Sequence, residues 1–193
     1  MSSVQNMFKK AGASSVITND PLVIERASKL LLPGVGAFDN CMQKLDDSGL
    51  RGLLGKKVLE EKTPLLGICV GLQMLMESSE EGKLNGLGWI KGKVSQFDKT
   101  QMAENPKIPN MGWLDVKVKK QSGLMNTLEG ARFYFVHSYH VNVSNPHDEL
   151  ISAMYGYEFT AGIERENIMG VQFHPEKSHR FGMQLLKNFA EKY

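Results

Sequence analysis

Residues 63–76 constrain the fold of this chain more than any other stretch. A proline opens the stretch, and the apolar run 65–68 is short enough to be a buried strand. Cys69 follows, with a glycine two residues away on either side, and good helix formers come after it. The predicted order is therefore a strand, a cysteine on the bend and a helix.

Such a bend suits a nucleophile because it projects the side chain away from the sheet, towards the N-terminus of the following helix. That helix end favours the negatively charged thiolate of Cys69. The spacing Gly-x-Cys-x-Gly is the cysteine version of the Gly-x-Ser-x-Gly nucleophile elbow. Most free cysteines are nevertheless buried structural thiols. These residues alone leave both interpretations open.

The length of 193 residues predicts one domain spanning residues 1–193. The net charge of +2 is too small to indicate nucleic-acid or membrane binding, and no apolar run is long enough to cross a bilayer. The first residues lack the apolar core of a signal peptide. The two cysteines, Cys41 and Cys69, do not indicate a disulfide scaffold, so we expect a cytoplasmic protein.

The first part of the chain alternates between helical and strand patterns. Helices are expected at 2–11, 21–27, 38–45 and 50–61, and strands at 16–18, 29–32 and 65–68. This alternation predicts an α/β fold with a parallel sheet, in which ligands bind beyond the carboxyl ends of the strands. The Pro-Gly-Val-Gly run at 33–36 and Cys69 both follow such strands, so we expect them at one site.

From residue 83 onward, alternating apolar and polar residues predict antiparallel strands. Strands are expected at 89–97, 113–118, 132–143 and 168–173, a hairpin at 151–157 and 159–164, and a last helix at 181–190. The polar segment 100–109 is expected to be an exposed loop.

His174, Pro175 and Glu176 follow the last predicted strand. Pro175 favours an extended backbone at His174, which would turn His174 and Glu176 to the same side. A thiol, an imidazole and a carboxylate that holds the imidazole make a nucleophilic triad. Taken singly, His174 reads as a loop cap and Glu176 as a solvated charge. The glycines at 33–36 let backbone N–H groups approach a developing oxyanion, or else form an ordinary turn.

Together these motifs resemble the class I (triad) glutamine amidotransferases. The matching runs are GICVGLQ at 67–73, PGVG at 33–36 and QFHPE at 172–176. The runs RFYFVHSYHV at 132–141, MGW at 111–113, HPEKS at 174–178 and LLKNF at 185–189 are similar to the HisH group, the glutaminase subunits of imidazole glycerol phosphate synthase. The resemblance covers nearly the whole chain. It implies a flavodoxin-like, mostly parallel mixed sheet flanked by helices, with an additional small antiparallel sheet.

The resemblance also implies roles for individual residues. Cys69 would attack the side-chain amide of glutamine, His174 would transfer protons, and Glu176 would orient His174. The oxyanion would lie at Val35 and Gly36. The substrate's amino-acid end would contact Gln73, Ser138, Tyr139 and His140. Trp113, Tyr139 and Lys177 would face the partner, a (β/α)8-barrel synthase subunit (HisF-like) that receives ammonia for imidazole glycerol phosphate formation. No metal or organic cofactor is expected.

The chain departs from the family pattern at its start, at residues 109–114 and, mildly, at Val70, where the family usually has Leu. Family members begin with an apolar strand and a Gly-Asn loop ahead of the first helix, whereas this chain begins at that helix, so we expect a central strand to be absent. A family-like Pro-His-Met-Gly-Trp-Asn reads Pro-Asn-Met-Gly-Trp-Leu at 109–114, at an expected partner-facing surface. Two alternatives stay open: a relative that supplies ammonia for amino-sugar modification in surface-polysaccharide synthesis, favoured by residues 82–89 and 180–184, and a catalytically silent binding subunit.

Overall fold

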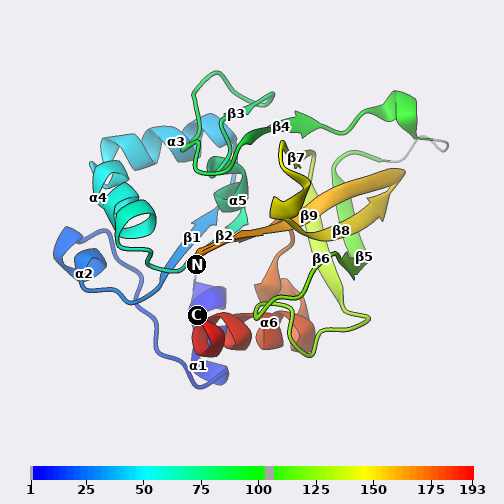
Figure 1. Cartoon of the computed structure of the whole chain (residues 1–193). Coiled ribbons are helices and arrows are strands. Elements are labelled where there is room, and N and C mark those ends of the chain that lie inside the picture. Colours follow the sequence, from blue (N-terminus) through cyan, green and yellow to red (C-terminus); the bar gives the residue numbers. More distant parts are fainter. Residues whose placement is uncertain (1, 103–106) are drawn as a thin grey trace.

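A mixed sheet runs through the middle of the molecule, with helices on both of its faces (Figure 1). The computed structural model describes residues 2–102 and 107–193. Helices α3, α4 and α5 lie on one side of strands β1 and β2, and α1 and α6 pack together on the other side (Figure 1). The helices are α1 (Ser2–Lys10), α2 (Pro21–Glu25), α3 (Phe38–Asp47), α4 (Arg51–Gly55), α5 (Val70–Met74) and α6 (His179–Lys192).

The strands follow the order β1-β2-β10-β9-β7-β4-β3, and β5, β6 and β8 extend the sheet off this path. Their bounds are β1 (Leu30–Gly34), β2 (Leu65–Cys69), β3 (Ser78–Ser79), β4 (Gly92–Gln96), β5 (Asn110–Val118), β6 (Arg132–His137), β7 (Tyr139–Val143), β8 (Glu149–Tyr155), β9 (Tyr157–Arg165) and β10 (Ile168–Val171). Short helical turns η1 (Lys56–Glu60), η2 (Lys99–Gln101), η3 (Pro146–Asp148) and η4 (Pro175–Lys177) complete the described chain.

The expected α/β class is confirmed, but parallel pairing is less extensive than the resemblance implied. Parallel pairs join β1 with β2, β2 with β10, and β3 with β4, whereas the other pairs are antiparallel. Parallel strands need long crossover connections, and most of the second half of the chain forms hairpins instead. The expected antiparallel addition is present as the β5–β6 pair.

The strand expected at 16–18 is wrong, because the structure has no strand there. Val16 and Ile17 are 68% and 52% exposed. Among the described residues β1 pairs only with β2, so residues 16–18 do not pair with β1. A β-branched run forms a strand only where a partner satisfies its backbone N–H and C=O groups.

Several other expected elements differ in extent. The helix expected at 50–61 is α4 continued by the π-helical turn η1, and the strand expected at 132–143 breaks at Ser138 into β6 and β7. The hairpin at 151–164 is present as β8 and β9. Of the loop expected at 100–109, residues 100 and 101 belong to η2, and 103–106 lie outside the described residues.

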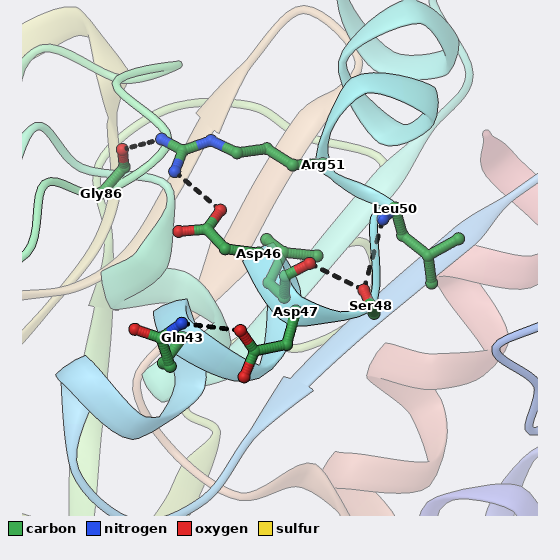
Figure 2. A network of polar contacts seen from close by, with 8 residues as sticks. Gln43, Asp46, Asp47, Ser48, Leu50, Arg51 and Gly86 are labelled. Carbon is green, nitrogen blue, oxygen red and sulfur yellow. Dashed lines mark hydrogen bonds and ion pairs between the residues drawn. The ribbon is translucent and has the colours of Figure 1, made fainter.

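The turn between α3 and α4 is fixed by side chains (Figure 2). The Ser48 hydroxyl donates to the Leu45 carbonyl at 2.7 Å and accepts the Leu50 N–H at 3.3 Å. Arg51 donates to Asp46 at 3.0 Å and to the Gly86 carbonyl at 2.7 Å. Arg51 therefore joins this helical turn to the loop that precedes β4.

The core lies on both faces of the central strands. All five residues of β2 are buried, as expected for a strand covered on both faces. Beneath the end of β10, the rings of Phe133 and Phe173 stack with their centroids 3.8 Å apart. Within the described ranges, no helix is both long and apolar enough to cross a membrane. The buried centre of the sheet supports the residues that follow β1, β2 and β10.

Candidate active site

Cys69 is the last residue of β2 and lies directly before α5, so the predicted strand–cysteine–helix order is confirmed. Its backbone has φ 57° and ψ −115°, a conformation that residues other than glycine rarely adopt. A sharp, strained strand-to-helix turn is the geometry of a nucleophile elbow. A Cβ on Gly71 would lie 1.8 Å from the Leu32 carbonyl oxygen, so the turn packs too tightly against β1 for any other residue there.

His174 and Glu176 follow β10, which pairs in parallel with β2. Because the carboxyl ends of both strands meet at one edge of the sheet, His174 lies close enough to Cys69 for the thiol to affect the pKa of the imidazole. Nδ1 of His174 lies 2.8 Å from Oε1 of Glu176. Cys69 and His174 are 6% and 7% exposed, so the two side chains meet in a nearly dry environment.

Opposing effects set the protonation of this pair. Burial, the largest influence, lowers the pKa of His174, but Cys69 and Glu176 outweigh it and raise that pKa to about 9. Burial raises the pKa of Glu176, and the hydrogen bond with His174 reverses this so that the pKa lies below its usual value. The arrangement therefore favours a protonated imidazole held by the Glu176 carboxylate.

Ser178 holds the loop that carries this pair, a role that no sequence pattern indicated. Its buried hydroxyl donates to the His174 carbonyl at 2.7 Å and accepts the Tyr134 N–H at 3.0 Å. The His174 N–H in turn donates to the Tyr134 carbonyl at 2.9 Å. Strand β6 thus fixes the backbone at His174.

The predicted oxyanion loop lies beside the nucleophile. Gly34 ends β1 as the register partner of Cys69, and Val35 and Gly36 follow at once. Val35 is 74% exposed, and Gly36 has φ +92°, which favours glycine. The Cys41 thiol donates to the Val35 carbonyl at 3.5 Å. The glycines at 34 and 36 therefore serve different purposes: close packing and a left-handed turn.

Gln73 is buried and hydrogen-bonded within the protein, and its predicted contact with the substrate stays a prediction. Its amide Nε2 donates to the Tyr139 carbonyl and to Oε1 of Gln172, both at 3.1 Å. Nε2 of Gln172 then donates to Cys69 Sγ at 3.9 Å. Gln172, which is fully buried, belongs to the QFHPE run of the family resemblance, but the sequence assigned it no role. These four residues form one polar chain that ends at the nucleophile.

The bend between β6 and β7 carries the other predicted substrate contacts. The Ser138 carbonyl accepts the Phe97 N–H at 3.2 Å, so it is already paired. The His140 ring points into the core, where its Nε2 lies 3.1 Å from the Tyr157 hydroxyl and burial lowers its pKa. The contact of this bend with the substrate's amino-acid end stays a prediction.

Two of the three predicted partner-facing residues lie on one surface. The ring of Tyr134 lies between them, with Trp113 6.0 Å away edge-on and the Lys177 ammonium 5.8 Å from its centre. Trp113 also stacks on His179 at 5.5 Å. No contact joins Tyr139 to this pair among the described residues.

Asn110 does not lie on that surface, so the expectation of a partner-facing position is wrong. It is 1% exposed, and its Nδ2 lies 3.0 Å from Nε2 of His137. A polar side chain at the start of β5 is buried here because the His137 ring satisfies its hydrogen bond. Leu114, the other departure in that stretch, is half-buried in β5.

Comparisons with known proteins agree with this geometry. The family model described as "Glutamine amidotransferase class-I" matches residues 3–193. The chain is 50% identical to "Imidazole glycerol phosphate synthase subunit HisH 2" of Methanococcus maripaludis over 98% of this chain and 93% of that protein. It is 49% identical to the HisH subunit of Bdellovibrio bacteriovorus over 96% and 92%, respectively.

Solved structures show the same fold at low sequence identity. A "Crystal structure of glutamine amidotransferase" superposes with a TM-score of 0.71 at 17% identity, covering 96% of this chain and 93% of that one. The crystal structure of a glutamine amidotransferase from Thermotoga maritima gives a TM-score of 0.60 at 18% identity, covering 97% of this chain and 75% of that one.

Proposed function

Because the chain belongs to the class I glutamine amidotransferases, we propose that it is the glutaminase subunit of an imidazole glycerol phosphate synthase in histidine biosynthesis. It hydrolyses glutamine to glutamate and ammonia. The match over residues 3–193 supports a single domain spanning residues 1–193. The proposal includes a cytoplasmic setting, in which reducing conditions keep the Cys69 thiol free.

The observation that carries the proposal is the convergence of Cys69, His174 and Glu176 after two parallel strands. The Cys69 thiolate attacks the side-chain amide carbon of glutamine and forms a tetrahedral oxyanion. His174 gives a proton to the leaving nitrogen, so ammonia departs and a γ-glutamyl thioester remains. Water, deprotonated by His174, then cleaves the thioester to glutamate and the free thiol. Glu176 holds the imidazole in the required tautomer.

The loop after β1 supplies the oxyanion site in this proposal. Val35 and Gly36 directly follow Gly34, the register partner of Cys69, and this position supports their backbone N–H groups as the oxyanion donors. Donors aimed at developing negative charge stabilise the transition state more than the substrate. In this proposal Gln73 and the backbone around Ser138, Tyr139 and His140 hold the amino-acid end of glutamine.

Ammonia passes from this site to the partner, a (β/α)8-barrel subunit that forms imidazole glycerol phosphate. The synthase names of the relatives support this partner. Ammonia must travel uncharged, because a dry passage disfavours ammonium. The partner is proposed to contact two places on this chain. One is the surface around Trp113 and Lys177, which both lie against the Tyr134 ring, and the other is the bend at Tyr139.

The test is glutamate release by the chain together with its barrel partner, for wild type and Cys69→Ala. We expect hydrolysis by the wild type, no hydrolysis by the variant, and a γ-glutamyl adduct on Cys69 in peptide mass spectra. Unchanged hydrolysis by Cys69→Ala would refute the mechanism. No hydrolysis by either protein would indicate the silent binding subunit. Hydrolysis that couples only to a barrel acting on an amino sugar would indicate the surface-polysaccharide alternative.

A further inference from the structure

A buried chain of hydrogen bonds ends at the nucleophile, and the direction of each donor in it is fixed. The chain starts at the Tyr139 carbonyl, which can only accept hydrogen bonds. Gln73 must therefore turn its NH2 group towards Tyr139, and the same nitrogen donates to Oε1 of Gln172. With its oxygen so engaged, Gln172 is left with its NH2 group facing Cys69 Sγ, 3.9 Å away.

The same carbonyl fixes a second branch. Nδ1 of His137 lies 2.8 Å from the Tyr139 oxygen and must carry the proton, so Nε2 of that ring accepts from Asn110 at 3.0 Å. Burial lowers the pKa of His137 to about 3, which keeps the ring neutral. The orientation of both amides in the Gln73–Gln172 chain is therefore set by the Tyr139 carbonyl oxygen. The buried side chains of Gln73 and His137 both donate hydrogen bonds to this oxygen.

We propose that Gln172 is a positioning residue for the nucleophile: its amide N–H, aimed by Gln73 and the Tyr139 carbonyl, donates to Cys69 Sγ and stabilises the thiolate. This inference rests on the proposed function in taking Cys69 as the nucleophile. Gln172 is 0% exposed and Gln73 3%, so water does not compete for these bonds. Hydrogen bonds to a charged acceptor are stronger than neutral ones, and more so away from water.

The titratable groups around Cys69 come from three elements among the described residues. They are His174, which follows β10, Glu176 in η4 behind it, and Cys41 on α3, whose pKa is raised mainly by burial and to a lesser extent by Cys69. His174 is the other group that favours the thiolate. Gln172 differs from His174 because its donation does not depend on pH, so its loss moves the titration of Cys69 without removing the imidazole.

The test is the rate at which iodoacetamide alkylates Cys69 in the isolated chain, followed by peptide mass spectrometry across the pH range in which thiols titrate. Gln172→Met keeps the length and apolar packing of the side chain but removes the donor. We expect the midpoint of the alkylation profile to rise by about one pH unit, and the rate near neutral pH to fall about tenfold. Gln172→Glu, which places an acceptor against the sulfur, is expected to raise the midpoint at least as far.

Two further variants complete the design. Gln73→Leu removes the group that orients Gln172 and is expected to raise the midpoint by less than Gln172→Met does. Gln184→Met is the matched control, because Gln184 is a half-buried glutamine on α6 that donates to Asn188 at 2.8 Å, and its midpoint is expected to match wild type. Circular dichroism melts establish which variants fold.

An unchanged midpoint in folded Gln172→Met and Gln172→Glu would overturn the inference. If neither folds, an unchanged midpoint in Gln73→Leu would overturn it, and a raised one would support it. Because alkylation needs neither glutamine nor a partner, the role of Gln172 and the proposed glutaminase function can be refuted independently of each other. A midpoint that responds to Gln172 in a protein without glutaminase activity would refute the proposed function alone. Glutamine hydrolysis with an unresponsive midpoint would refute this inference alone.

Discussion

Gly34 and Cys69 are register partners at the carboxyl ends of the parallel strands β1 and β2. A Cβ on Gly34 would lie 2.5 Å from the backbone nitrogen of Gly71 and 2.8 Å from the Val70 Cβ. The first turn of α5 thus presses against β1, and this contact aligns the proposed oxyanion loop with the nucleophile.

Gly34→Ala is expected to disturb both stability and chemistry. Overpacking at a site bounded by backbone atoms costs about 1–3 kcal/mol of unfolding free energy. The shift of α5 or β1 that relieves the clash also misaligns Cys69, so glutaminase activity falls. Gly52→Ala is the control, because Gly52 lies in α4 with no atom within 4 Å of an added Cβ. Chemical denaturation of both variants checks the prediction, and equal stabilities would contradict it.

The strained backbone at Cys69 predicts an unusual order of stability among substitutions. At φ 57° and ψ −115°, a residue with a Cβ stores strain of about 1–3 kcal/mol, which glycine does not. We therefore expect Cys69→Gly to unfold at a higher temperature than Cys69→Ala, although both lack the nucleophile. Differential scanning calorimetry decides this, and a lower melting temperature for the glycine variant would argue against strain at this position.

The His174–Glu176 pair predicts how stability depends on pH. The folded pKa of His174, about 9, lies above its ordinary 6.5, so this contribution is complete below pH 6.5 and is lost as the pH rises towards 9. The pKa of Glu176 lies below its ordinary 4.5, so its contribution is present above pH 4.5 and is lost on acidification. The stability advantage of wild type over Glu176→Gln should therefore be greatest between pH 4.5 and 6.5. Thermal melts over a pH series measure it, and a pH-independent advantage would rule out this pairing.

Ser178→Ala is expected to loosen the loop that carries His174. The variant leaves the Tyr134 N–H without its partner at 3.0 Å, and an unpaired buried donor costs about 1–3 kcal/mol. Glutaminase activity should fall through kcat, because the backbone of His174 loses its support from Ser178 at 2.7 Å. Ser178→Thr, which keeps the hydroxyl, should lose less activity. Equal activities for alanine and threonine would exclude the hydrogen bond as the cause.

The surface formed by Trp113, Tyr134 and Lys177 is expected to bind the barrel partner. Trp113→Ala removes a half-buried ring that stacks on His179, and losing such an anchor costs about 2 kcal/mol or more of binding free energy. Met154→Ala, at an exposed position on β8, is the control. Titration calorimetry with the barrel measures both affinities. If both variants bind as tightly as wild type does, the interface lies elsewhere.

The sequence by itself determined the elements that depend on local pattern. The apolar run before Cys69, its flanking glycines and the following helix formers predicted the elbow, because a short chain segment contains all the causes. The order His174, Pro175, Glu176 likewise predicted that the side chains of His174 and Glu176 lie on the same side, where they form a hydrogen bond. The same local reasoning failed at 16–18, because a strand exists only with a partner that the segment itself does not contain.

Only the tertiary structure decided which polar groups meet inside the core. Gln172 and Gln73 are 99 residues apart, Ser178 and Tyr134 are 44 apart, and Asn110 and His137 are 27 apart. Their contacts follow from the pairing order of the strands, in which β10 lies between β2 and β9. The role of a buried amide or hydroxyl depends on its hydrogen-bond partner, and folding brings that partner from a distant part of the chain.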